Sequence, residues 1–400
     1  MGKRQILLIT ILLVSVAVMV SCNKLLPGVP ADDSVLDGPV EGLTGEQNQA
    51  FLRGDIAFND DIFTSSNGLG PTFVATTCGS CHAGDGKGHP FTTLTRFGQS
   101  DTLGNKFLHL GGPQLQSRAL PGIQPETIPA GATFSNFTPP ANTGLGLLEA
   151  VPDAVLLGLS DELDADGDGI SGRPNWIHIP NYCLSRPGTI ERNGRYIGRF
   201  GKKAAVYDLQ QQTANAYNQD MGVNSSYESY NTYNGLQIDP EISNQKVLDV
   251  IFYLKTLKAP IQRDQNNADV VAGKQIFTNI SCGKCHTPQL QTGTSSIAAL
   301  ANKTIFPYTD LLLHDMGAAL NDGYTEGSAM AAEWRTPPLW GLGLSKNSQG
   351  GKVFLLHDGR AKSIEEAVSF HGGEASQSKS KFQQLNATDK AKLIQFLESL

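Results

Sequence analysis

Two copies of one five-residue motif constrain this chain more than any other feature. They are Cys78-Gly-Ser-Cys81-His82 and Cys282-Gly-Lys-Cys285-His286. In such a Cys-x-x-Cys-His segment, two thiols can add to the two vinyl groups of one haem while the histidine ligates its iron. With 6 Cys and 8 His among 400 residues, roughly 0.002 copies are expected by chance. The motifs therefore predict two covalently bound c-type haems.

Other uses of paired cysteines fit these motifs less well. A zinc site places its Cys-x-x-Cys pairs about 15–20 residues apart, whereas 204 residues separate His82 from His286. A thioredoxin-like pair lies in a βαβ setting, which neither motif has. Outside the motifs and the N-terminal segment, Cys183 is the one further cysteine. We expect it to be an unpaired, buried thiol.

Residues 1–21 have the pattern of a bacterial lipoprotein signal peptide. Lys3 and Arg4 precede 15 uncharged, mostly apolar residues at 6–20, a run too short to span a membrane. The run leads into Ser21-Cys22, which predicts lipidation at Cys22; the alternative is an ordinary signal peptide with an incidental cysteine. Residues 22–44 are expected to form a tether. We therefore expect an exported lipoprotein that faces the periplasm, anchored through its lipid, most consistently in the outer membrane.

The charge content excludes two classes of protein. Asp and Glu exceed Lys and Arg by 38 to 31, and charged residues make up 17% of the chain, against roughly 25% in an average domain. A disordered chain would be richer in charge and poorer in apolar residues. A nucleic-acid-binding protein would carry a basic face. A globular protein with no nucleic-acid partner is expected.

Helical periodicity arranges the chain as an imperfect repeat around the two motifs. A helix is predicted before each motif and another at the end of each half, at 46–58, 246–257, 268–277 and 390–400. A helix before the motif and a terminal helix form the layout of a class I cytochrome c domain. We expect a mainly α fold with two such domains, at 45–259 and 266–400. The first carries a loop-rich insertion at about 90–245.

A second, shorter sequence repeat supports this arrangement. Thr138-Pro-Pro140 and Gly144-Leu-Gly146 recur as Thr336-Pro-Pro338 and Gly341-Leu-Gly343. With these elements, residues 45–400 resemble the di-haem cytochrome c peroxidase superfamily. Within it they are most similar to the di-haem oxidoreductase branch, whose members are named peroxidases or thiol oxidoreductases. Further segments that carry the resemblance are Gly198-Arg-Phe-Gly201, Leu311-Leu-Leu-His-Asp-Met-Gly317, Trp334-Arg-Thr-Pro-Pro-Leu339 and His357-Asp-Gly-Arg360.

The resemblance implies a division of labour between the haems. The C-terminal haem takes electrons from a small redox donor of the cytochrome or cupredoxin type, and the N-terminal haem reduces H₂O₂. Superfamily peroxidases place a glutamate over the N-terminal iron to move a proton between the peroxide oxygens. Glu149 lies in the apolar segment Leu147–Val151, where a lone carboxyl has a raised pKa. It is the catalytic candidate, and a structural hydrogen bond is its alternative role.

His371 is the expected second ligand of the C-terminal iron. Ser363 and Glu366 form the pattern of a capping box, which predicts a helix start. Ile364, Ala367, Val368 and His371 then follow helical spacing, so they share one face. In the classical bacterial peroxidases the matching helix carries a Met ligand. Ligation by His286 and His371 would lower the potential relative to His/Met.

Other side chains compete for roles at the two irons. The alternative ligands at the C-terminal iron are His314 and Met316, and His371 could instead cap its helix. His357 and Arg360 could pair with haem propionates or lie in a solvated loop. No distal ligand is evident for the N-terminal iron, since His89 and His109 lie in glycine-flanked loops and are expected at the surface.

An acidic loop follows the pattern of a calcium site. Asp164, Asp166 and Asp168 take loop positions 1, 3 and 5, with Gly169 at position 6, as in an EF-hand. Position 12 is Asn175 rather than Glu, so the alternative is a metal-free, Asx-rich turn. For the whole chain, the alternatives to a peroxidase are a di-haem electron carrier, for instance in metal uptake, and a thiol oxidoreductase.

Overall fold

The computed structural model describes residues 31–101 and 103–400. Leu36–Leu400 form a compact unit of their own, separate from the N-terminal 35 residues. The predicted signal peptide, the lipidation site Cys22 and the first part of the tether lie outside the described residues. Among the helices that are described, none combines the length and the apolar character needed to cross a bilayer.

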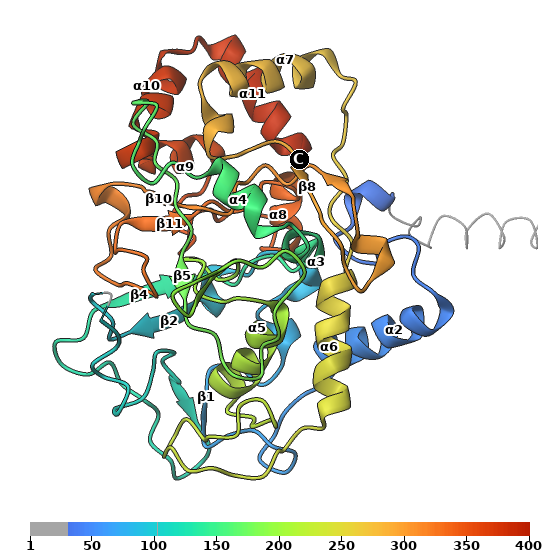
Figure 1. Ribbon diagram of the computed structural model, residues 1–400, viewed down its shortest axis with the longest axis vertical. Coiled ribbons are helices and arrows are strands. Elements are labelled where there is room, and N and C mark those ends of the chain that lie inside the picture. The colour runs from blue at the N-terminus through green and yellow to red at the C-terminus, as the bar shows by residue number, and fades with distance from the viewer. Residues whose placement is uncertain (1–30, 102) are drawn as a thin grey trace, which may run out of the picture. The chain divides into compact units, whose positions relative to one another are not determined.

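The helices predicted from periodicity are all present, with ends that differ by up to three residues (Figure 1). The helices are α2 (Gly45–Asn59), α3 (Leu145–Glu149), α4 (Asp153–Leu159), α5 (Leu209–Asn215), α6 (Asn244–Thr256), α7 (Ala268–Asn279), α8 (Ser345–Ser348), α9 (Ile364–Phe370), α10 (Ser376–Gln384) and α11 (Ala387–Ser399).

Side-chain caps explain where the four long helices begin. The Thr44 hydroxyl accepts a hydrogen bond from the Gln47 backbone N–H, and the Gln47 side chain accepts one from the Thr44 N–H, which completes a capping box. At α6, α7 and α11 only the N-cap side chain takes part: Ser243, Asn267 and Asn386 each accept from a backbone N–H of the first turn. Each cap satisfies backbone donors that would otherwise lack a partner in the first turn.

The predicted repeat takes the form of two helix pairs built alike. Helix α2 packs on α6, and α7 packs on α11, as Figure 1 shows at the right and at the top. Both crossings rely on a glycine. A Cβ at Gly54 would overlap the Asp249 carbonyl oxygen and lie 2.6 Å from the Tyr253 Cβ. A Cβ at Gly273 would overlap the Lys392 carbonyl oxygen in the same manner. The helices can approach this closely only because both side chains are absent.

The two repeated Gly-Leu-Gly segments also have matching structural roles. The backbone N–H of Gly144 donates to the Leu257 carbonyl oxygen at 3.1 Å, just past the end of α6. The N–H of Gly341 donates to the carbonyl oxygen of Leu400, just past the end of α11, at 2.6 Å. Both glycines have φ near +70°, which favours glycine. The Gly-Leu-Gly segments therefore dock on the terminal helix of each half.

The fold class is mixed, with about 35% helix and 11% strand, so the expectation of a mainly α fold is confirmed only in part. Strands pair as β1–β3, β2–β4, β5–β7–β6, β8–β9 and β10–β11, all antiparallel. The strands are β1 (Thr72–Phe73), β2 (Leu94–Phe97), β3 (Arg118–Ala119), β4 (Phe134–Phe137), β5 (Trp176–Ile177), β6 (Glu191–Arg192), β7 (Arg195–Ile197), β8 (Leu290–Gln291), β9 (Thr304–Ile305), β10 (Leu313–Asp315) and β11 (Glu333–Arg335). They tie the long connections together between the helices.

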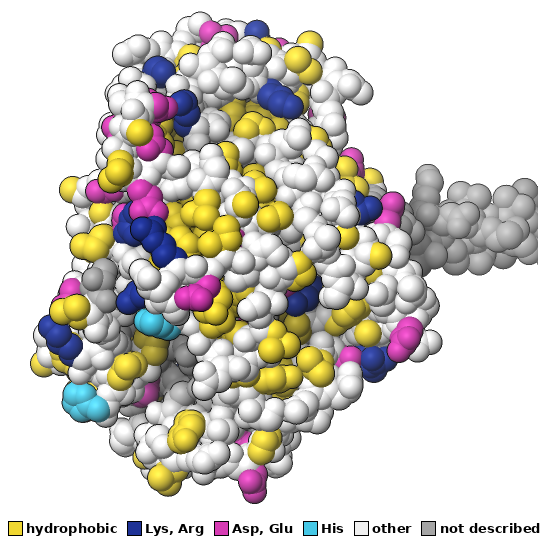
Figure 2. Space-filling model, in the orientation of Figure 1, with side chains coloured by type: hydrophobic (Ala, Val, Ile, Leu, Met, Phe, Trp, Pro, Cys, Tyr) yellow, Lys and Arg dark blue, Asp and Glu magenta, His cyan; other side chains and the backbone are white. Residues whose placement is uncertain are grey.

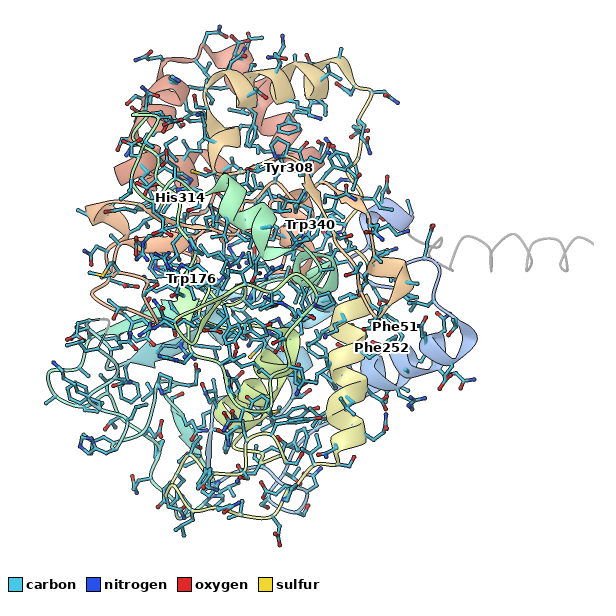
Figure 3. The ribbon with its side chains drawn as sticks, viewed as in Figure 1. Phe51, Trp176, Phe252, Tyr308, His314 and Trp340 are labelled. Carbon is cyan, nitrogen blue, oxygen red and sulfur yellow. The ribbon has the colours of Figure 1, made fainter. Side chains whose placement is uncertain are left out.

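The three largest clusters of the apolar core are one in each half and one shared by both. Phe51 of α2 belongs to the first, with Phe252 of α6 packed against it (Figure 3). The second surrounds Phe277 and Phe396. The third joins Leu148 and other residues of the first half to Trp340 and others of the second. The domain boundary predicted near residue 260 remains a prediction. Residues from both sides of it contribute to this shared cluster.

The surface shown in Figure 2 carries charges of both signs, and apolar side chains gather in groups near the middle of this face. Lys and Arg are interspersed with Asp and Glu on this face rather than gathered into a stripe.

Candidate haem site

A mostly apolar cavity of about 370 Å³ joins the two halves of the unit. Its volume falls within the usual range of about 300–1,000 Å³ for small-molecule and cofactor sites. The cavity brings together most of the predicted haem residues, namely His82, Cys282, Cys285, His286 and His371. Cys78 and Cys81 do not line the cavity, although they belong to the same motif as His82.

Both motifs fold into the same short turn. Cys78–Ser80 and Cys282–Lys284 each form one 3₁₀ turn. The N–H groups of His82 and His286 donate to the carbonyl oxygens of the first cysteine in their motif, at 3.1 Å and 3.0 Å. Both thiols and the imidazole of a motif are thus held on a single turn, as attachment to one haem requires.

The described cysteines are all free, as expected for a chain whose cysteines are not a disulfide framework. Burial raises the pKa of Cys78 and of Cys282 to about 12. The thiols are therefore protonated at neutral pH. Cys183 is buried, as predicted, and its thiol faces the Asp208 carboxylate at 3.7 Å.

Three cavity histidines are held in one tautomer. Each Nδ1 bonds a backbone carbonyl oxygen: His82 to Pro140 at 2.9 Å, His286 to Tyr308 at 3.1 Å and His371 to Ala367 at 2.8 Å. Because a carbonyl can only accept, the proton lies on Nδ1 and Nε2 keeps its lone pair. Burial also lowers the pKa of His82 and of His286 to about 4. A neutral imidazole with a fixed tautomer is what iron ligation requires.

His371 lies at the end of α9, directly after Phe370. The Ser363 hydroxyl accepts from the Glu366 N–H at 3.0 Å, so the predicted N-cap is present. The predicted box is not complete, because the Glu366 carboxylate accepts from the Lys362 N–H instead. His286 and His371 both line the cavity.

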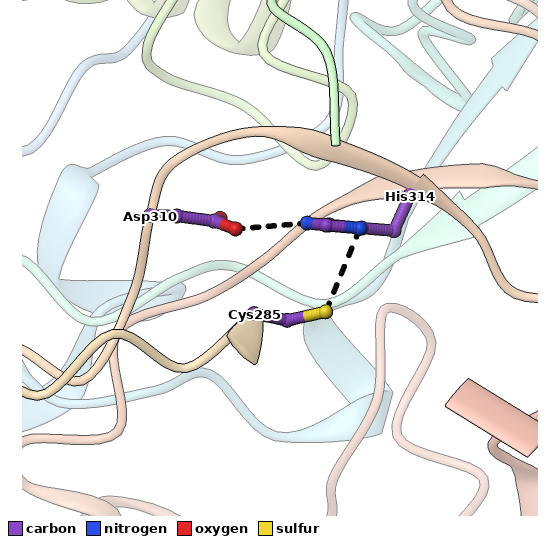
Figure 4. Close-up of side chains that lie close together, drawn as sticks. All are labelled: Cys285, Asp310 and His314. Atoms are coloured by element: carbon purple, nitrogen blue, oxygen red, sulfur yellow. Dashed lines mark hydrogen bonds and ion pairs between the residues drawn. The ribbon is translucent and has the colours of Figure 1, made fainter. Parts of the chain in front are cut away.

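His314, the competing ligand, has no free nitrogen. Its Nε2 bonds the Asp310 carboxylate at 2.8 Å and its Nδ1 bonds Glu374 at 2.6 Å, with the Cys285 sulfur 3.5 Å from Nδ1 (Figure 4). These partners outweigh burial and raise the pKa of His314 well above 6.5. A doubly bonded imidazolium cannot offer a lone pair to iron. The geometry therefore favours His371 over His314.

Residues 135–400 match the family model described as "Di-haem oxidoreductase, putative peroxidase". The chain belongs to this family. The match includes the second Cys-x-x-Cys-His motif but begins after the first. None of the curated proteins matches the chain. Among solved structures, Kuenenia stuttgartiensis hydrazine synthase pressurised with xenon aligns with a TM-score of 0.39 and 14% identity, over 94% of this chain and 98% of that one.

Membership in the di-haem oxidoreductase family means a redox role with haem as cofactor. The residues of the cavity fit that group. Iron needs a neutral imidazole, which His82, His286 and His371 supply, and the porphyrin needs an apolar enclosure. The cavity supplies this with side chains such as Leu148 and Phe200.

Glu149 has a different setting from the lone apolar one expected. Its carboxylate pairs with the Lys255 ammonium at 2.7 Å and accepts from the Leu209 N–H at 2.7 Å. The side chain links α3, α5 and α6, and it does not line the cavity, although Leu148 and Leu209 do. These contacts correspond to the structural role named as its alternative.

The acidic loop has a carboxylate cluster that differs from the predicted one by one member. Asp161, Asp164 and Asp166 place one carboxylate oxygen each within 4.8 Å of the others. Asp168 instead pairs with Lys284 of the second motif at 2.6 Å. Several of these carboxylates also accept backbone N–H bonds within the loop, as in an Asx-rich turn. The loop thus contacts the segment that holds the second motif.

Two of the remaining predicted histidines lie outside the cavity. The His89 ring contacts the Phe91 ring in a tilted arrangement and does not line the cavity, and His109 is exposed. His357 does line the cavity, stacked on Trp334 with 3.7 Å between ring centroids. Arg360 pairs with Asp358 at 2.7 Å and does not line it.

Sequence reasoning missed four basic residues of the cavity, Lys87, Lys202, Arg335 and Lys379. A signal was present, because Lys202 directly follows Gly198–Gly201 and Arg335 lies inside the Trp334–Leu339 segment. Both segments carry the family resemblance.

Proposed function

We propose that the chain is an exported di-haem c-type oxidoreductase that reduces hydrogen peroxide. The two motifs attach one haem each, and the C-terminal haem receives electrons one at a time. Electrons then pass to the N-terminal haem, where peroxide is reduced. The observation that carries the proposal is the unequal distribution of ligand side chains along the cavity.

The second half supplies two neutral imidazoles that line the cavity. His286 and His371 each keep Nε2 free, so they would hold the C-terminal haem iron between them, and a haem with two histidine ligands would supply electron transfer. The first half supplies His82 alone. Its only methionine, Met221, is buried in the helix core, and none of its other described histidines lines the cavity. An iron on His82 thus keeps a face open to a small oxidant.

When bound, haem supplies one-electron redox chemistry and an open coordination position. The chain's own residues fix the imidazole tautomers, exclude bulk water with apolar side chains and deliver protons. No Asp or Glu of the described chain lines the cavity. Glu149 is the proposed proton carrier. It can act only if its carboxylate turns away from the Leu209 N–H or from Lys255.

The position of the protein in the cell is part of the proposal. Cys22 would carry the lipid that holds the chain at the outer membrane, facing the periplasm. A small cytochrome or cupredoxin would donate electrons.

A calcium ion in the acidic loop would neutralise the Asp161, Asp164 and Asp166 carboxylates, which lie within 4.8 Å of one another. The two matching helix pairs support the interpretation of the halves as two cytochrome c-like domains.

Spectroscopy of the holo-protein tests the proposal. We expect one high-spin and one low-spin haem in the optical and EPR spectra of the oxidised or half-reduced form, and turnover of H₂O₂ with a reducing dye. Two six-coordinate irons with no turnover in any redox state would replace the peroxidase with the electron-carrier alternative.

The role of Glu149 has its own test within that assay. Glu149→Gln keeps the shape but cannot carry a proton, so turnover is expected to fall about 10²-fold or more, with unchanged haem spectra. Glu162→Gln is the matched control, since Glu162 is largely exposed on the surface. Equal turnover of Glu149→Gln and wild type would leave Glu149 with a structural role only.

A further inference from the structure

Besides Lys379 of α10, three basic side chains from distant parts of the chain line the cavity. Lys87 follows the first motif, Lys202 lies in the insertion, and Arg335 ends β11 in the second half. The Arg335 backbone N–H donates to the Lys202 carbonyl oxygen at 3.0 Å, so these two residues are adjacent. Burial, and after it the charges of Lys87 and Arg335, lower the pKa of Lys202. The chain therefore gathers like charges in an apolar enclosure.

The carboxylates near these cations are already engaged elsewhere. Asp358, which acts on both lysines, pairs with Arg360 at 2.7 Å. Asp310, which acts on Arg335, pairs with His314 at 2.8 Å. No acidic residue of the described chain lines the cavity.

The cations themselves bond mainly to backbone carbonyl oxygens. Lys87 donates to Leu356 at 3.1 Å, and Arg335 donates to Gly201 at 2.9 Å and to Thr336 at 3.2 Å. The Lys202 ammonium has no hydrogen-bond partner among the described residues. Charges held in a low-dielectric site without counter-charges are costly. Such a cluster is expected to have an anionic occupant.

We propose that Lys87, Lys202 and Arg335 form one shared binding site for the propionates of both haems. Each haem carries two propionates, and ammonium and guanidinium groups bind carboxylates through short charge-assisted hydrogen bonds. The inference rests on the proposed function only in that haem occupies the cavity. These three residues take the place of Arg360 as partners of the propionates, because Arg360 pairs with Asp358 and does not line the cavity.

The cluster is shared because it lies where the two halves meet. Arg335 of the second half donates its backbone N–H to the Lys202 carbonyl oxygen at 3.0 Å, and Lys87 of the first half donates its ammonium to the Leu356 carbonyl oxygen at 3.1 Å. Lys87 and Arg335 bring one further cation from each half. The propionate edges of the two haems therefore meet at this cluster. Loss of the Lys202 charge is then expected to change the reduction potential of both haems.

A potentiometric titration of Lys202→Met holo-protein tests the inference. The variant removes the charge and keeps the side-chain length. Because uncompensated propionates disfavour addition of an electron, the equilibrium constant for reduction is expected to fall about tenfold at both haems, which is about 59 mV for each one-electron couple. Lys202→Arg is expected to keep both potentials near those of wild type. Lys352→Met, which removes an exposed lysine, is the matched control and should change neither potential.

Two results overturn the inference. Potentials in Lys202→Met that match those in Lys352→Met remove the propionate site, and a shift at one haem alone removes its sharing. If Lys202→Met does not accumulate as holo-protein, Arg335→Gln gives the same measurement from the other half. The readout is a potential and the haem mass is measured in parallel. A failure of peroxide turnover therefore leaves this test intact.

Discussion

The substitution His314→Gln removes the one cation from a buried pair of carboxylates. His314 is 3% exposed and bridges Asp310 and Glu374 through its two ring nitrogens. A glutamine side chain donates from a single nitrogen atom, so it cannot reproduce two bonds on opposite sides of a ring. At least one carboxylate is left without its partner.

The expected cost is about 3–5 kcal/mol in the free energy of unfolding, as for a buried ion pair broken on one side. The cost depends on pH in both directions. The pKa of His314 is raised above 6.5, so its contribution is complete below about pH 6.5 and is lost as the pH rises through the raised value. The pKa of Glu374 is lowered from 4.5, so its contribution is lost as the pH falls below about 4.5. The largest difference is expected near pH 5.5.

Urea unfolding of the holo-protein, followed by far-ultraviolet circular dichroism from pH 5.5 upward, measures this cost. His109→Gln is the matched control, because His109 is exposed and its variant should unfold like wild type. The low-spin haem signal should survive in His314→Gln, since His371 rather than His314 is the proposed ligand of the iron. A loss of less than about 1 kcal/mol at pH 5.5, or a difference that grows with pH, would refute this account of the cluster.

Three further outcomes follow from the proposed sites. His371→Ala should convert the low-spin haem to high-spin while both haems stay attached, as checked by EPR and a haem-stained gel; an unchanged spectrum would return the role to Met316 or His314. Removal of calcium with EGTA should lower the Tm, by the equivalent of up to about 2.7 kcal/mol if the ion was present at 100 times its Kd, and an insensitive Tm would remove the site. Cys22→Ser should move the protein from the membrane fraction to the soluble fraction, and unchanged fractionation would contradict lipidation.

The long helices could be predicted because each carries its own periodic signal. Residues 246–257 and 390–400 show apolar positions at helical spacing, and the helices α6 and α11 begin within a few residues of the predicted starts. Strands β10 and β11 could not be found in this way. Each has three residues, and Leu313 pairs with Arg335 across a long loop. A strand of three residues is too short to show alternation.

The ligands of the candidate site were partly predictable for a related reason. The two motifs and His371 are local patterns, in which residues a few positions apart already determine the chemistry. Glu149 required knowledge of a partner more than 100 residues away, since Lys255 lies on α6. The expectation of a lone carboxyl came from its sequence neighbours alone, and a tertiary ion pair gives no such signal.

The role of the basic residues of the cavity could not be predicted either, because it depends on the charge balance of the whole site rather than on a single contact. Lys87, Lys202 and Arg335 come from three separate segments, and no local sequence shows that their side chains line one cavity. Their meaning depends on which acids are already paired, and Asp310 and Asp358 are committed to His314 and Arg360. Only the folded chain shows that positive charge remains where no acid lines the wall. A cofactor that brings its own carboxylates completes that balance, which links the fold of the loops to the chemistry of the two irons.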